Sequence, residues 1–259
     1  MSAPPADRLR TWLTSPGALR VPQIGVMFWL IKGLSTAMGE STSDYLVHSM
    51  APELAVLLGF AAFLAALVVQ FRVARYAPWA YWSAVVMVGI FGTMAADVVH
   101  VALGIPYVAS TAFYAVVLAA VFVVWRKMEG TLSIHSINTP RRECFYWATV
   151  VATFAMGTAL GDLTAYTLHL GYFPSALLFG GLIVVPAVGY RFFHWNSVFS
   201  FWFAYVLTRP LGASLADGLG KPKTASGIGL GAGPLVLVFL AVIALLVLYL
   251  SMTGADVQA

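Results

Sequence analysis

Charged residues are scarce in this sequence: they make up 9% of its 259 residues, whereas 61% are hydrophobic. A soluble core of this size cannot bury so much apolar surface, which excludes an ordinary soluble globular protein and favours one embedded in a lipid bilayer. The single cysteine, Cys144, excludes an internal disulfide and a thiolate-rich metal cluster, and it leaves the redox compartment undetermined.

Catalytic and nucleotide-binding motifs are also lacking. The sequence has no nucleophile elbow, no serine, histidine and acid arrangement, and no haem-attachment or zinc pattern. The glycine-rich stretches 218–224 and 227–233 resemble a phosphate loop, but neither completes a nucleotide motif or follows a predicted strand. We therefore expect no enzyme activity, no cofactor and no nucleic-acid partner.

Long apolar segments predict an all-α integral membrane protein of about eight helices, since about 20 apolar residues span a bilayer core. The transmembrane domain is expected at 21–253, with an N-terminal tail at 1–20 and a C-terminal tail at 254–259. No small-residue cleavage site follows the basic tail, so the first segment is predicted to be retained as a span. The predicted spans are 22–46, 53–71, 79–101, 105–125, 144–167, 173–191, 197–219 and 234–252.

Basic residues mark one side of this topology. Ten of them precede the first span or follow the second, fourth and sixth spans, whereas Lys221 and Lys223 alone lie in links on the opposite side. Basic residues concentrate in cytoplasmic links, so both termini are expected to be cytoplasmic.

A motif of the form W-x9-G-x4-D recurs in every odd-numbered span. Its members are Trp29, Gly39 and Asp44; Trp82, Gly92 and Asp97; Trp147, Gly157 and Asp162; and Trp202, Gly212 and Asp217. The other two aspartates, Asp7 and Asp256, lie in the tails, so four matches at one offset indicate an internal repeat. The tryptophans are expected to be interfacial anchors or packing residues.

Four two-helix repeats are therefore predicted, at about 21–75, 76–128, 140–193 and 194–253. Because each repeat has two spans, successive copies enter the membrane from the same side and are related by an axis along the membrane normal. A ring of four units around a central path is the simplest arrangement, and two pairs packed side by side would also satisfy the pattern.

Polar residues share a helix face with the repeated aspartates. Four residues before each aspartate lie Glu40, Thr93, Thr158 and Ala213, and i+4 spacing puts these on the aspartate's face. Lys32 and Arg209 lie on the same face and are the predicted charge partners of the acids. Five acids thus face two bases, and carboxylates in lipid usually face a bundle interior, a partner or water.

This excess of acid predicts a membrane transport protein for a small cation, through a path lined by Glu40 and the four repeated aspartates. Oxygen ligands without thiolates favour a hard divalent metal as substrate, such as Mg²⁺, Ca²⁺ or Mn²⁺, and the five acids are also its candidate metal ligands. Proton coupling is left open: His48, His100 and His169 follow the aspartates and are candidate ligands or proton relays.

A structural interpretation of the acids is also open. The aspartates lie near the ends of their spans and would then cap the next helix or touch headgroups. In that case the protein would be a non-transporting scaffold or accessory subunit, with Lys32 and Arg209 neutralising buried acids. The sequence leaves the ion, the direction of movement and the oligomeric state undetermined.

Three stretches, at 21–46, 145–168 and 201–223, resemble a bacterial family of uncharacterised membrane-anchored proteins. The resemblance extends over nearly the whole membrane region, and the second repeat, with GTMAAD at 92–97, is the most degenerate. The resemblance implies a multi-pass protein of the bacterial inner membrane and implies no particular activity.

Overall fold

The computed structural model describes residues 17–258, so most of the predicted N-terminal tail and the last residue lie outside the described part. This range forms eight α-helices and no strand, and the helices agree closely with the predicted spans. They are α2 (Val26–Ser49), α3 (Pro52–Arg72), α4 (Pro78–Asp97), α5 (Tyr107–Glu129), α6 (Pro140–Asp162), α7 (Tyr172–Phe193), α8 (Ser197–Gly220) and α9 (Ala232–Thr253).

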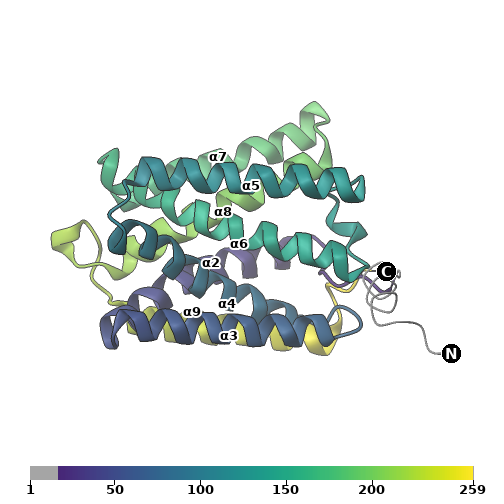
Figure 1. Cartoon of the computed structure of the whole chain (residues 1–259), viewed down its shortest axis with the longest axis horizontal. Coiled ribbons are helices and arrows are strands. Elements are labelled where there is room, and N and C mark those ends of the chain that lie inside the picture. The colour runs from purple at the N-terminus through teal and green to yellow at the C-terminus, as the bar shows by residue number, and fades with distance from the viewer. Residues whose placement is uncertain (1–16, 259) are drawn as a thin grey trace.

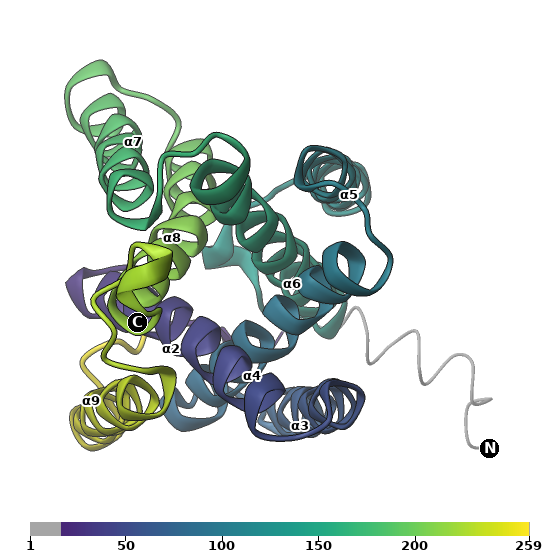
Figure 2. The same cartoon turned by 90° about the vertical axis from the view of Figure 1, so that its left-hand side faces the viewer.

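The four helices that carry the repeated motif form an inner ring. Each of α2, α4, α6 and α8 packs against the next, and α8 closes the ring on α2 (Figure 2). The other four helices lie outside this ring. Three of them, α3, α5 and α7, each pack mainly on the inner helix that follows in the chain, whereas α9, the last helix, packs mainly on α2, the first inner helix. Each repeat therefore joins its successor, and of the two predicted arrangements the structure has the ring.

Exposure separates the two layers. About a fifth of the residues in the most apolar part of each outer helix, α3, α5, α7 and α9, are buried. In the inner helices α4 and α6, more than half of these residues are buried. Within residues 17–258, six helices are long and apolar enough to cross a membrane, and α2 and α8 are not among these six. Both run alongside the apolar helices (Figure 1) and are more polar, and their charged residues Lys32, Glu40 and Arg209 are buried within the bundle. The chain is thus a multi-pass membrane protein.

Local signals explain the helix ends. Proline occupies an N-terminal position of α3, α4 and α6, where its missing N–H would be unpaired in any case. A left-handed glycine, Gly130 or Gly254, ends α5 and α9. Two inner helices continue as a π-helical turn directly after their aspartate, over Val98–Ala102 and Leu163–Thr167.

An extended segment, residues 17–25, crosses the end of the bundle that also holds the C-terminal tail, here called the termini end (Figure 1). Its backbone bonds to the α5–α6 link, to Tyr76 and to Asp256. Arg20 reaches Glu143, buried at the start of α6, at 2.7 Å, and Gln70 donates to the same carboxylate at 2.8 Å. Residues 17–25 are therefore fixed across this end of the bundle.

Candidate functional site

Residues at the same offset from each tryptophan lie at the same level of the inner ring. The aromatic layer, defined as Phe28, Tyr81, Tyr146 and Phe201, is nearest the termini end. Here the hydroxyls of Tyr81 and Tyr146 are hydrogen-bonded, and the rings of Phe28 and Phe201 are 5.9 Å apart. The tryptophans beside this layer pack within the bundle, three of them at 5% exposure or less, so packing is their role here.

The repeated glycines are the contact points between neighbouring inner helices. A Cβ added to Gly39 would lie 2.8 Å from the backbone of Gly89, and one added to Gly92 would lie 2.8 Å from Cβ of Phe154. Gly157 meets Arg209 and Gly212 meets Thr36 in the same way. In every case the partner lies seven residues after the next tryptophan, so one contact recurs around the ring. Small residues permit such close approach in membrane helices.

We predict that Gly157→Ala destabilises the protein. The new Cβ would lie 2.6 Å from Cβ of Arg209 and 3.0 Å from Cδ of Pro210, and overpacking of this kind costs about 1–3 kcal/mol. The melting temperature in detergent should fall by about 5 °C. Gly181→Ala is the matched control, because nothing lies within 4 Å of its added Cβ. Equal melting temperatures for the two variants would contradict the close-contact interpretation.

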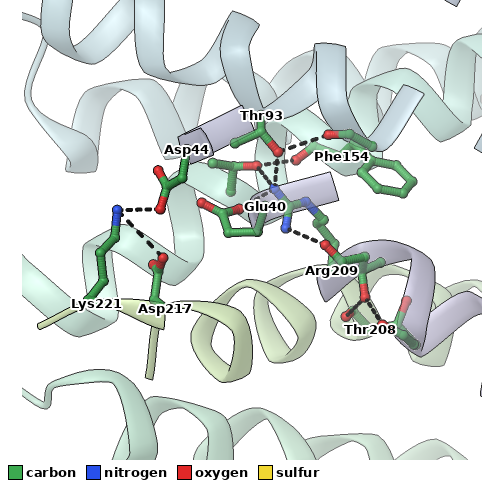
Figure 3. A network of polar contacts seen from close by, with 12 residues as sticks. Glu40, Asp44, Thr93, Phe154, Thr208, Arg209, Asp217 and Lys221 are labelled. Carbon is green, nitrogen blue, oxygen red and sulfur yellow. Dashed lines mark hydrogen bonds and ion pairs between the residues drawn. The ribbon is translucent and has the colours of Figure 1, made fainter. Parts of the chain in front are cut away.

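Arg209 is fully buried and reaches from α8 to residues of the other three inner helices (Figure 3). Its Nη2 donates to Glu40 Oε2 at 2.6 Å, to Thr158 Oγ1 at 2.7 Å and to Thr93 Oγ1. The hydroxyl hydrogens of both threonines point to backbone carbonyls four residues earlier, which leaves their oxygens free to accept. Its Nη1 also faces the carbonyl of Thr36 at 3.4 Å. This arginine layer, Arg209 with Glu40, Thr93 and Thr158, joins all four inner helices.

Lys32, expected as a second charge partner, does not reach an acid. Its side chain is fully buried, with Nζ 4.0 Å from the centre of the Phe154 ring and 4.3 Å from that of Tyr205. Nζ has no hydrogen-bond acceptor among the described residues. Lys32 lies two helical turns from Glu40, toward the aromatic layer, and this separation keeps it from the carboxylates.

The four repeated aspartates with Lys221 form what we call the acidic mouth, at the end of the ring opposite the termini end. Lys221 forms an ion pair with Asp44 and lies 3.8 Å from Asp217 (Figure 3). Burial lowers the pKa of Lys221, but the carboxylates of Asp217 and Asp44 raise it by more, so its ammonium stays charged well above neutral pH. Lys221 is not among the charge partners predicted from the sequence, although it lies four residues after Asp217, a spacing that puts both side chains on one helix face.

Asp97 and Asp162 are half-buried, as Asp44 is, and they differ from the other two aspartates in lying away from Lys221. Among residues 17–258, neither carboxylate takes part in an ion pair or a side-chain hydrogen bond. Each is followed directly by a π-helical turn, a feature often found at functional sites. The aspartates do not cap the following helices, whose N-cap positions are Ala51, Pro106, Gly171 and Gly231.

The three candidate histidines bond to backbone or face outward. His48 contacts the carbonyl of Asp44 at 2.7 Å, and His100 contacts that of Ile105 at 2.7 Å while stacking on Tyr107. His169 is exposed, with a left-handed backbone. Within the described residues, no group of three or more His, Cys, Asp or Glu side chains is arranged to hold a metal ion. Of the five candidate metal ligands, Glu40 is instead paired with Arg209, and Asp44 and Asp217 lie beside Lys221. Asp97 and Asp162 form no ion pair within residues 17–258.

One family model matches the chain. It is described as a repeat of unknown function (DUF347) and matches residues 27–76, 80–131, 145–194 and 200–256. These four matches confirm the resemblance to a four-repeat family, and each contains one inner and one outer helix. Searches of curated proteins and of solved structures give no match.

Proposed function

Since the chain belongs to the family of the DUF347 repeat, we propose its function from the geometry of the ring: it moves a small cation across the membrane along the ring axis. The cation enters at the acidic mouth, passes the arginine layer and leaves past the aromatic layer. In this proposal the membrane is the bacterial inner membrane, the termini end is cytoplasmic and the mouth faces outward.

The unpaired state of Asp97 and Asp162 carries this proposal. Five acids lie from Glu40 outward, against Arg209 and Lys221, so the acids at this end outnumber their basic partners. Carboxylates at the edge of a low-dielectric bundle raise the local concentration of cations. Rings of acidic side chains mark cation paths in other membrane proteins for this reason. A purely structural acid would be paired or would cap a helix, and these two do neither within the described residues.

The arrangement favours transient binding over tight chelation. No three-ligand metal site is assembled in residues 17–258, so a divalent cation would keep most of its water at the mouth. Mg²⁺ and related hard cations commonly bind in this way, through one or two carboxylates. Weak binding also suits conduction, because the ion has to leave as well as enter. A hard divalent metal therefore remains the proposed substrate class.

The closed state of the ring supports a carrier more than an open channel. Arg209, fully buried, bonds across the ring to α2, α4 and α6 between the mouth and the aromatic layer. The aromatic layer and residues 17–25 close the termini end. A cation would thus reach Glu40 only by displacing Arg209, and opening of the termini end would follow. Proteins with parallel repeats commonly alternate access by moving one repeat against another.

A scaffold function is the second candidate, and one observation favours it. Arg209 bonds across to α2, α4 and α6 from α8, and this suits an arginine whose role is to hold four repeats together. A scaffold needs no unpaired acids at the mouth, so movement of ions distinguishes the two functions.

We expect purified protein in liposomes to move at least one ion from a panel of Mn²⁺, Mg²⁺, Ca²⁺, Zn²⁺, Ni²⁺ and Na⁺, above the leak of empty liposomes. The same ion should raise the melting temperature in detergent, since a ligand at 100 times its dissociation constant stabilises the folded state by about 2.7 kcal/mol. Absence of both effects for every ion would leave the scaffold as the better interpretation.

A further inference from the structure

Lys32 is fully buried, and its Nζ has no hydrogen-bond acceptor in the part of the chain that the structure describes. Its Nζ lies between the faces of Phe154 on α6 and Tyr205 on α8, at 4.0 and 4.3 Å from the ring centres. No ion pair involves it within residues 17–258, and Nζ makes no hydrogen bond there. Cation–π contacts offset part of the loss of water around a buried charge, but a buried charge without a partner stays unfavourable.

The charged neighbour of Lys32 has the same sign. Arg209 contacts the same Phe154 ring, with its Cζ 5.5 Å from the ring centre. The other titratable group facing Lys32 from α8 is Tyr205, whose hydroxyl is also buried without a partner. The helix α9, which packs on α2, contains no charged residue, and the acids of α4 and α6 lie at the ends of those helices. Lys32 and Arg209 thus lie in one buried region, where Glu40 supplies the carboxylate and is already paired with Arg209.

Only one of these two cations can give up its proton. The guanidinium of Arg209 stays protonated in proteins and is paired with Glu40 at 2.6 Å. A lysine ammonium loses its proton readily when buried, which makes lysine a proton-exchanging group in dry sites. In the closed ring, repulsion by Arg209 therefore favours the neutral amine of Lys32. Movement of Arg209 away from Glu40 would remove that repulsion.

Buried tyrosines lie between Lys32 and the termini end, but their hydroxyls do not form a continuous series of hydrogen bonds. Tyr205, whose ring faces Lys32, has no hydrogen-bond partner for its hydroxyl among the described residues. The hydroxyls of Tyr146 and Tyr81 are hydrogen-bonded to each other, and Tyr76 donates to Asp256 in the C-terminal tail. A proton that leaves Lys32 therefore has to pass to water.

We propose that Lys32 binds and releases a proton during each transport cycle, so that proton movement is coupled to cation movement. This inference rests on the proposed function. An N–H bond of the ammonium breaks, the amine keeps the electron pair of that bond, and the proton passes to a water molecule admitted when the ring opens. Lys32 gains a proton when Arg209 moves away from Glu40 and loses it when Arg209 returns, so Arg209 links proton binding to cation passage.

Lys32→Met in liposomes tests the coupling, with Mn²⁺ as the probe and a pH-sensitive dye trapped inside. With wild-type protein the internal pH should change as Mn²⁺ moves. With the variant this pH change should be at least about tenfold smaller. Exchange of labelled Mn²⁺ at equal concentrations on both sides should continue in the variant. Lys223→Met, an exposed lysine in the α8–α9 link, should behave as wild type. Proton movement unchanged in Lys32→Met would overturn the inference and leave the proposed function intact.

A second measurement does not depend on transport. A lysine that is neutral in the folded protein takes up a proton on unfolding, so its contribution to stability rises with pH up to the ordinary lysine pKa of about 10.4. The melting temperature of wild type should therefore rise from pH 7 to 10 relative to Lys32→Met. Parallel pH profiles would overturn the inference. Wild-type protein that moves no ion while the profiles still diverge would contradict the proposed function and retain Lys32 as a proton-binding group.

Discussion

Replacing both Asp97 and Asp162 with asparagine is expected to abolish cation movement while the protein still folds. At an effective dielectric constant of 20, each carboxylate attracts a monovalent cation about 10 Å away by roughly 1–2 kcal/mol, and a divalent cation by twice that. Losing both should lower the rate at low cation concentration about a hundredfold or more. The measurement is uptake into liposomes of the ion that wild-type protein moves.

Stability distinguishes a transport defect from a folding defect in this variant. Neither aspartate has a partner within the described residues, so their neutralisation removes repulsion and should leave the melting temperature unchanged or raise it. Glu53→Gln is the matched control, because Glu53 is an exposed acid at the start of α3, next in the chain after α2. Uptake at the wild-type rate in the double variant would remove the main support for transport.

Replacing Arg209 with methionine is expected to give the largest loss of stability. The change leaves Glu40, 5% exposed, without its partner and removes the donor to Thr93 and Thr158. Breaking a buried ion pair by removing one member costs about 3–5 kcal/mol. The melting temperature in detergent should fall by about 10 °C.

Removing the second member of the pair tests the reason for that loss. Arg209→Met with Glu40→Met should recover most of the stability, because apolar side chains of similar volume often replace a buried pair without net cost. Arg191→Met, at an exposed arginine of α7, should leave the melting temperature unchanged. If Arg209→Met itself melts within about 1 °C of wild type, the arginine layer does not hold the ring together.

The repeat and the helices could be predicted because both depend on local patterns. Apolar runs of nearly the right length predicted all eight helices, with the first beginning four residues later than expected, at Val26. The offset between tryptophan, glycine and aspartate predicted four units, and the family match has the same four. The function of the glycine became clear only from the ring, in which it meets the residue seven after the next tryptophan.

Pairing between charged side chains could be predicted only in part. Helical spacing placed Lys32, Glu40 and Arg209 on one face of their helices, and Arg209 does meet Glu40. The same spacing suggested that Lys32 would neutralise acids, but in the structure it faces the rings of Phe154 and Tyr205. The partner of Asp44 proved to be Lys221, which comes from the end of another inner helix.

Apolar runs and the repeated motif were enough to predict a multi-pass helical membrane protein with four like repeats, each with an acid at the same height. This was possible because 3.6 residues per turn fix the face and height of every side chain along one helix. Which acids are paired could be learned only from the packed structure, because the distance between side chains on different helices depends on how all four inner helices pack. Asp97 and Asp162 share their motif with Asp44 and Asp217, and the position of Lys221 at the mouth gives a partner to the second pair and not to the first.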